Sequence, residues 1–162
     1  MILTAATVLT GEYSHSPGWV EVDHGVISAV GSGVPPRPAD VDLGDVVLTP
    51  GFVDMHVHGG GGGAYFEATD TAVAASVTLH RRFGTTSTIA SLVSDHHDVL
   101  VAQVRALADH VESGELLGIH LEGPWLSPHR CGAHEPSALR DPDPAEVSAL
   151  LSARGIGIVE LE

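Results

Sequence analysis

The stretch Pro50-Gly51-Phe52-Val53-Asp54-Met55-His56-Val57-His58-Gly59, with four more glycines directly after it, decides how the rest of this chain is interpreted. The apolar residues 46–48 and 52–53 predict a buried β-strand that runs into a His-x-His pair. Because side chains alternate along a strand, Asp54, His56 and His58 are expected on one side. Two imidazoles one strand repeat apart can bind one divalent cation together, and we favour this over two bystander surface histidines.

Composition limits the classes of protein to which the chain can belong. Its 162 residues suit one domain or a little more, and a hydrophobic fraction of 43% is enough for a packed core. The sequence shows no secretion signal and no membrane span, and the single cysteine excludes an internal disulfide, so we expect a soluble, cytoplasmic protein. The formal net charge of −14 argues against nucleic acid or an anionic membrane as a partner.

Residues 1–48 are predicted to be all β. The pair His24-Gly25 is typical of a tight hairpin turn, and the Pro- and Gly-rich residues 31–40 indicate a loop. The predicted strands cover residues 2–9, 19–23, 26–30 and 41–48.

After residue 63 the pattern changes to alternating strands and helices. We predict helices at 71–83, 96–111 and 144–153, and strands at 85–93, 116–122 and 155–161. Ser94-Asp95 and Asp143 are the expected caps of the second and third helices. This alternation predicts a parallel sheet with right-handed crossovers. A closed eight-stranded barrel needs about 250 residues, so residues 49–162 have room for an open sheet or the first half of a barrel.

A second group of polar residues ends the predicted strand at 116–122. Glu122 lies at the carboxyl end of this strand, which is the same end as His56 and His58 in a parallel sheet. One carboxylate facing two imidazoles suits a divalent ion with nitrogen and oxygen ligands, and a surface or helix-capping acid is the alternative. His120 shares the face of Glu122, and it is equally suited to contact an ion directly or to support a ligand.

A third group lies in the loop of residues 125–136. Long loops at this end of a barrel usually bind substrate. His134 can hydrogen-bond a sugar hydroxyl or an anionic oxygen, although a solvent-exposed histidine is the alternative interpretation. The neighbouring Arg130 could lower the pKa of Cys131, but we expect a merely exposed thiol.

These motifs resemble those of a known family. Residues 50–59 resemble the metal-dependent amidohydrolase superfamily, whose members combine a barrel with a small β-sandwich. Gly118-Ile-His-Leu-Glu-Gly-Pro-Trp-Leu-Ser-Pro and Gly132-Ala-His are similar to the N-acetylglucosamine-6-phosphate deacetylases within it. The resemblance implies an α/β fold, with a (β/α)8 TIM barrel of amidohydrolase type of which about the first half is present. Residues 1–48 would be part of the sandwich, and residues 49–162 the first four βα units.

The resemblance also implies roles for particular side chains. It places a divalent metal ion, zinc before iron or another ion, at one or two positions per site. The implied metal ligands are His56, His58 and Glu122, the implied substrate-contacting residues are Ala133 and His134, and the residues without a settled role are Asp54, His120 and Cys131. The family's catalytic aspartate, two further metal histidines and its phosphate-binding residues would lie beyond residue 162, so no catalytic residue is expected within this chain.

The implied activity is hydrolysis of N-acetylglucosamine 6-phosphate to glucosamine 6-phosphate and acetate, by a full-length protein that forms homodimers. The ion would activate water, and the aspartate would transfer the proton to the leaving amine. We expect the isolated 162-residue chain to be inactive and prone to association. The alternatives are another amidohydrolase that acts on a cyclic amide, and a non-catalytic remnant that binds a metal or a sugar phosphate.

Overall fold

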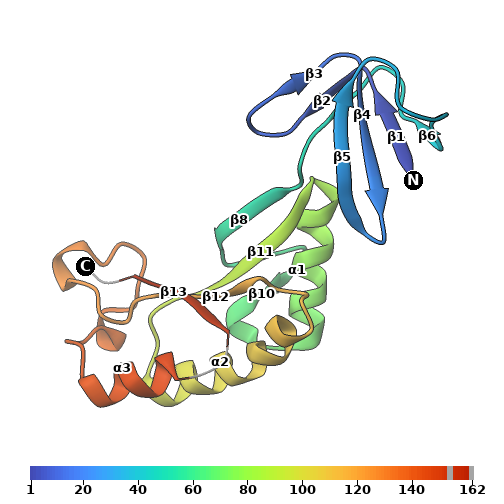
Figure 1. The fold of residues 1–162 in the computed structure, drawn as a ribbon. Helices are drawn as coiled ribbons and strands as arrows, with labels where there is room; N and C mark the ends of the chain where they lie inside the picture. The colour runs from blue at the N-terminus through green and yellow to red at the C-terminus, as the bar shows by residue number, and fades with distance from the viewer. Residues whose placement is uncertain (153–154, 161–162) are drawn as a thin grey trace. The chain divides into compact units, whose positions relative to one another are not determined.

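The structure is a computed structural model that describes residues 1–152 and 155–160 (Figure 1). The chain divides into two compact units, Met1–Pro50 and Gly51–Glu162. The boundary expected from the sequence lies after residue 48. Each unit is described by itself.

The first unit consists of two small β-sheets. One sheet has the strand order β5-β4-β1-β6, and the other has the order β3-β2-β7. Ala5, Val8 and Val20 form its core, because the inward faces of short strands from both sheets meet there. The strands are β1 (Ile2–Ala5), β2 (Thr7–Leu9), β3 (Ser14–His15), β4 (Gly18–Asp23), β5 (Val26–Ser32), β6 (Val41–Asp42) and β7 (Val47–Leu48).

Two of the predicted strands in this unit are broken, and the predicted turn is present. The strand expected at 2–9 divides at Ala6 into β1 and β2, which belong to different sheets, and the strand expected at 41–48 divides into β6 and β7. Periodicity alone missed these breaks, because a strand that changes sheets keeps its alternation. His24 and Gly25 both have positive φ, 48° and 79°, as the tight turn between β4 and β5 requires.

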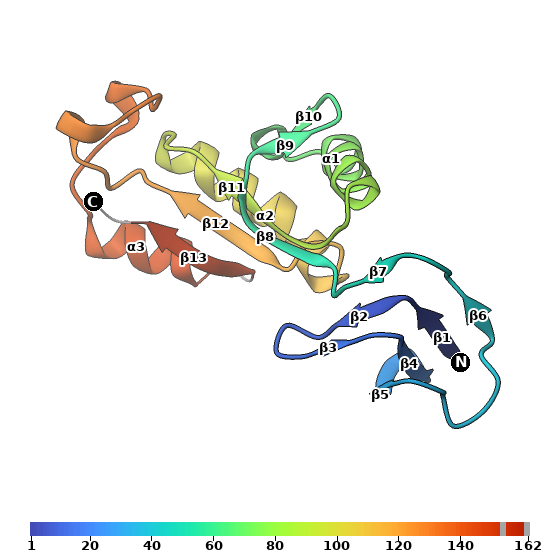
Figure 2. The same ribbon diagram turned by 90° about the horizontal axis from the view of Figure 1, so that it is seen from above.

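The second unit is built on a sheet of four parallel strands in the order β13-β12-β11-β8. Its ladders pair Ala90 with Val57 and Leu92 with Leu121, which brings the carboxyl ends of the strands to one edge (Figure 2). The strands are β8 (Phe52–Val57), β11 (Thr85–Leu92), β12 (Gly118–Glu122) and β13 (Ile156–Glu160). This is the predicted α/β architecture, and in the described residues the sheet is open rather than closed into a barrel.

Helices cover this sheet, with α2 and α3 running beneath the strands in the view of Figure 1. Apolar residues of β11 and β12, such as Leu92 and Ile119, pack against Val73 of α1 and Leu100 of α2 to form the main core. The helices are α1 (Asp70–Arg82), α2 (His97–Glu112) and α3 (Pro144–Leu151), and the shorter elements are β9 (Gly59–Gly60), β10 (Gly63–Ala64) and the 3-10 turns η1 (Tyr65–Glu67), η2 (Pro128–Arg130) and η3 (Pro136–Ala138). Among the described residues, none of these helices is sufficiently long and apolar to span a bilayer.

The helix caps agree with the sequence at one of the two positions predicted. The Asp143 carboxylate accepts hydrogen bonds from the Ala145 and Glu146 amides and caps α3, as predicted. The cap of α2 is His96, which makes no side-chain capping bond, so the prediction of Ser94-Asp95 was wrong. Both of these residues form other contacts near the site. Ala153 and Leu161, where the last predicted helix and strand end, lie outside the described residues.

Strand β8 is more exposed than its sequence predicts. Phe52, Val53 and Met55 are 62%, 58% and 59% exposed, whereas the neighbouring β11 is almost wholly buried from Thr88 onward. In the described part of the chain β8 pairs only with β11, so it is an edge strand. The expectation of one buried strand across residues 46–53 was wrong, because burial depends on neighbouring elements that an apolar run does not reveal.

The glycine run after β8 folds into the small hairpin of β9 and β10. At Gly59 φ is 137°, and a Cβ atom there would lie 2.4 Å from the Gly63 carbonyl oxygen. A Cβ atom at Gly63 would lie 2.5 Å from the carbonyl oxygen of Ala72 in α1. The hairpin therefore packs against the backbone of α1, because no side chain separates them. The Ser76 hydroxyl, buried in α1, donates to the Gly63 carbonyl at 3.1 Å and strengthens this contact.

Candidate metal centre

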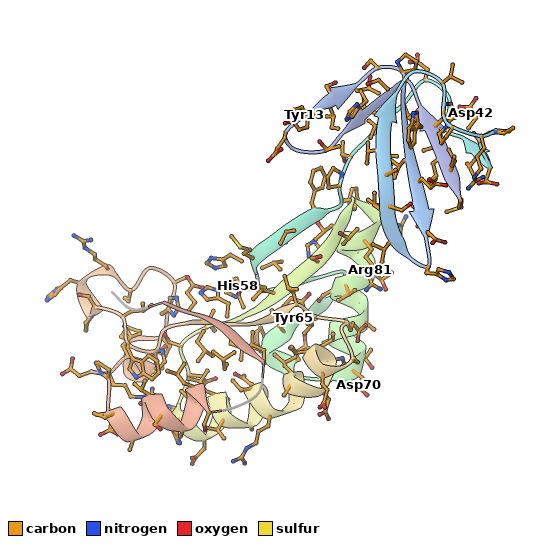
Figure 3. All side chains as sticks on the ribbon, in the orientation of Figure 1. Tyr13, Asp42, His58, Tyr65, Asp70 and Arg81 are labelled. Atoms are coloured by element: carbon orange, nitrogen blue, oxygen red, sulfur yellow. The ribbon has the colours of Figure 1, made fainter. Side chains whose placement is uncertain are left out.

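Three of the predicted site residues converge at the carboxyl edge of the sheet. The Nε2 atoms of His56 and His58 lie 3.2 Å apart, and they lie 3.3 and 3.0 Å from the Glu122 Oε2 atom. His56 is on β8, His58 follows it directly, and Glu122 ends β12, two strands away in the sheet. Figure 3 shows His58 where β8 ends. We call these three side chains the candidate metal centre, since in the described residues they form the one group whose ligand atoms gather in this way.

The spacing of these atoms fits one tetrahedral ion. Ligand bonds of 2.0–2.1 Å at tetrahedral angles put neighbouring ligand atoms about 3.3 Å apart. The observed separations of 3.0 to 3.3 Å match that edge length, and two imidazole nitrogens with one carboxylate oxygen are a donor set that Zn²⁺ and similar ions accept.

The hydrogen bond behind His58 favours the ring form that binds metal. His58 Nδ1 lies 3.2 Å from the backbone carbonyl oxygen of Ser91, which can only accept a hydrogen bond. Nδ1 therefore carries a proton directed at Ser91, and in the neutral ring the lone pair of Nε2 faces Glu122. Asp54 accepts the His56 amide at 3.2 Å, so its carboxylate supports the strand and is not part of the converging group.

His120 lies beneath the candidate metal centre. It is 3% exposed, and its ring packs edge-on against the His56 ring with centroids 4.8 Å apart. Its Nδ1 atom lies 2.9 Å from the hydroxyl of Ser91, and that hydroxyl also accepts the Val57 amide. His120 thus contacts the His56 ring but is not one of the three residues of the candidate metal centre.

The loop of residues 123–143 brings His134 to the other oxygen of Glu122. His134 Nε2 lies 3.4 Å from Glu122 Oε1, and its Nδ1 atom accepts the Ser94 amide at 3.2 Å. Because an amide N–H can only donate, the proton of His134 is on Nε2, directed toward the carboxylate. Ala133 and the half-buried Cys131 line one pocket of about 530 Å³ with His134 and Glu122, so the thiol lies beside the site.

Glu122 is ionised in this setting. Burial by itself would raise the pKa of its carboxyl group, but the hydrogen bond from His134, together with the attraction of His56, His134 and His58 whenever these rings are protonated, outweighs that effect and lowers the pKa. An ionised carboxylate beside two imidazoles is the state that a divalent cation requires.

Two supporting residues escaped the sequence analysis. Ser91 bonds His58 through its carbonyl and lies against His120 through its hydroxyl, and Ser94 fixes His134. Ser91 is 1% exposed and Ser94 is 6% exposed. For Ser91 the available signal was a serine within the apolar residues 89–93 that end the predicted strand, since a buried hydroxyl needs a partner.

The chain is a member of the amidohydrolase family, whose sequence pattern matches residues 47–158, a span that includes the whole candidate metal centre. Enzymes of this family are generally metal-dependent.

Within the family, the chain is similar to sugar-phosphate deacetylases. It is 34% identical over 136 residues to N-acetylglucosamine-6-phosphate deacetylase from Bacillus subtilis, covering 78% of this chain and 34% of that protein. It is 32% identical over 165 residues to N-acetylgalactosamine-6-phosphate deacetylase from Escherichia coli O157:H7, covering 93% of this chain and 40% of that protein.

A solved structure gives the same result. The N-acetyl-D-glucosamine-6-phosphate deacetylase D267A mutant from Mycobacterium smegmatis, in complex with N-acetyl-D-glucosamine-6-phosphate, is 50% identical, with a TM-score of 0.97 over 99% of this chain and 43% of that one. The resemblance seen in the motifs is therefore confirmed. The chain spans about a third to two fifths of the length of these curated relatives.

Proposed function

We propose that this chain forms part of an N-acetylglucosamine-6-phosphate deacetylase that hydrolyses its substrate to glucosamine 6-phosphate and acetate with the help of zinc. The observation that carries the proposal is the convergence of His56, His58 and Glu122 within 3.0 to 3.3 Å. It is supported by 50% identity to the Mycobacterium smegmatis deacetylase across nearly the whole chain.

Some of the site residues would hold an ion, and others would hold the sugar. His56, His58 and Glu122 would hold the ion, which when bound lowers the pKa of water and polarises an amide carbonyl. His134 would donate its Nε2 proton to an oxygen of the substrate, and Ala133 would contact the substrate beside it. The pocket lined by His58, Glu122 and the loop residues is large enough for a sugar phosphate.

The proposal includes assignments for the domains, the oligomeric state and the location of the protein. Residues 1–48 would be part of a small β-sandwich domain, and residues 49–162 the first four βα units of a barrel. The full-length protein would be a cytoplasmic homodimer, with a phosphorylated amino sugar as its partner.

A chimera tests the proposal directly. The matching segment of the Mycobacterium smegmatis deacetylase would be replaced by this chain, and acetate release from N-acetylglucosamine 6-phosphate would be measured. We expect activity in the chimera, less than about one hundredth of it after Glu122→Gln, and little change after the control Glu12→Gln, which alters an exposed carboxylate of the other unit.

The isolated chain supplies the complementary test. Isothermal titration should show one zinc ion bound per chain without acetate release. Zinc binding together with an inactive, well-folded chimera would favour a non-catalytic remnant. Hydrolysis of cyclic amides, without acetate release, would favour the alternative of an amidohydrolase that acts on cyclic amides. No zinc binding by either protein would contradict the proposal.

N-acetylgalactosamine 6-phosphate is the second candidate substrate, because two relatives at 32% identity are deacetylases of that sugar. The chimera should be assayed with both sugars. A higher kcat/KM for the galactosamine form would transfer the proposal to that substrate.

A further inference from the structure

The loop of residues 123–143 carries His134 to the candidate metal centre with little regular structure of its own. Its ordered parts are the 3-10 turns η2 and η3, of three residues each. Within the described residues, His134 contacts the sheet side of the site through Ser94 and Glu122. A loop of this length needs further anchoring if it is to hold an imidazole at a fixed distance from a carboxylate.

Glu146, in the first turn of α3, provides such an anchor. Its side chain is only 10% exposed. Both of its oxygens lie 3.1 Å from Arg140 Nε, and the indole N–H of Trp125 and the His97 Nδ1 atom approach at 3.3 and 3.1 Å. Trp125 lies at the beginning of the loop, Arg140 lies near its end, and His97 begins α2. One carboxylate therefore joins both ends of the loop to a neighbouring helix.

Arg140 extends this network toward His134. Its Nη1 atom donates to the backbone carbonyl oxygens of Asp95 and Ala138, at 2.9 and 2.6 Å, and its amide donates to the Pro124 carbonyl at 3.3 Å. Asp95 directly follows Ser94, whose amide binds His134 Nδ1. The guanidinium group thus holds Asp95, next to the residue that binds His134, and the backbone amide of Arg140 holds the base of the loop.

We propose that Arg140 and Glu146 are positioning residues that fix the 123–143 loop, and through Ser94 the imidazole of His134, against Glu122. The inference rests on the proposed function only for the role of His134 toward a substrate. The contacts themselves join side chains and backbone groups of this chain alone. Arginine suits this task because its planar fork bonds a carboxylate and two carbonyls at once, whereas a lysine ammonium lacks that geometry.

Hydrogen exchange at single amides tests this inference in the 162-residue chain. In Arg140→Gln, exchange of the Ser94 amide should rise at least about tenfold, because losing a charged partner frees the loop and removes the acceptor on His134. The Gly60 amide, bonded to the Ser76 hydroxyl outside the network, should keep its rate. Arg140→Lys should behave like Arg140→Gln, since charge alone does not restore the fork.

The control is Arg37→Gln, which removes an arginine from Glu21 and Asp40 in the other unit and should leave Ser94 exchange unchanged. An equal rise at Ser94 and Gly60 would mean general destabilisation, and an unchanged Ser94 rate would mean that the loop is held elsewhere. Either result overturns the proposal.

Two further measurements complete the test. If both Arg140 variants fail to fold, His97→Asn, at a half-exposed position, should raise Ser94 exchange about two- to threefold, and no rise would overturn the proposal. The nitrogen chemical shifts of the His134 ring should also move in Arg140→Gln, because Nδ1 loses its donor. Neither readout needs metal or turnover, so failure here is distinct from failure of the proposed deacetylase.

Discussion

The candidate site has a strand-borne half and a loop-borne half, and they are held in different ways. His56, His58 and Glu122 sit at strand ends, where parallel backbone ladders set their separation. His134 sits on a loop that depends on side-chain contacts from Ser94 and on the network of Arg140 and Glu146. Backbone ladders tolerate substitution of nearby side chains, whereas a side-chain network is lost with one member. We therefore expect metal affinity to depend mainly on the strand ends, and the exact position of the His134 imidazole to depend on the loop.

The largest effect should come from the strand-borne half. Glu122→Gln removes the charge and replaces one carboxylate oxygen by an NH2 group that cannot bind a cation, so zinc affinity should fall more than about a hundredfold, beyond the loss typical of a group behind the ligands. Titration against a competing chelator measures this. Glu135→Gln, in the same pocket, is the control. Unchanged zinc affinity in Glu122→Gln would mean that zinc does not bind at these strand ends.

Acid should weaken the loop-borne half through Glu146. The Glu146 pKa is about 2, against an ordinary 4.5. The hydrogen bond from Arg140 is the largest effect that lowers it, and burial acts in the opposite direction. Since the folded-state pKa is the lower one, the stabilisation is complete above about pH 5 and is lost as the pH falls toward 2. It amounts to about 3 kcal/mol.

Urea unfolding at several pH values tests this expectation. A Trp19→Phe background leaves Trp125, which touches Glu146, as the only indole. Glu146→Gln should be less stable than the parent at pH 7 and should lose less of its stability on acidification. Parallel pH curves for the two proteins would contradict the shifted pKa.

A smaller effect is expected when His134 itself is changed. His134→Gln removes a donor facing Glu122 without removing one of the three converging groups, so zinc affinity should fall about 10- to 100-fold. His129→Gln, on an exposed part of the same loop, is the matched control. A loss as large as that of Glu122→Gln would make His134 a direct ligand and would end the distinction between the two halves.

The smallest effect concerns the support of the strand-borne half. Tyr65, labelled in Figure 3, is fully buried, and its amide bonds the His58 carbonyl. Its hydroxyl has no hydrogen-bond partner among the described residues. Burial, aided by the charges of Asp54 and Glu115, raises its pKa to about 12. Tyr65→Phe should therefore raise the free energy of unfolding by about 1 kcal/mol, and exposed Tyr13→Phe should not. A marked loss of stability would indicate a bound water.

The sequence predicted the parts of this molecule that follow from local periodicity. The strand and helix alternation, the Asp143 cap and the shared edge of His58 and Glu122 all come from spacing along the chain. Ser91 and Arg140 could not be found in this way. Ser91 acts partly through its backbone carbonyl, and Arg140 contacts Asp95 and Pro124, which only the fold brings near it. The exposure of β8 was missed for the same reason.

The hairpin of β9 and β10 has a consequence for laboratory evolution. Gly63 lies against the Ala72 backbone, where an added methyl group would collide with main-chain atoms that cannot rotate away. In a randomised library selected only for folded chains, with no demand for zinc or turnover, this codon should still return glycine. Invariance at such a position would record a steric exclusion and carry no information about chemistry.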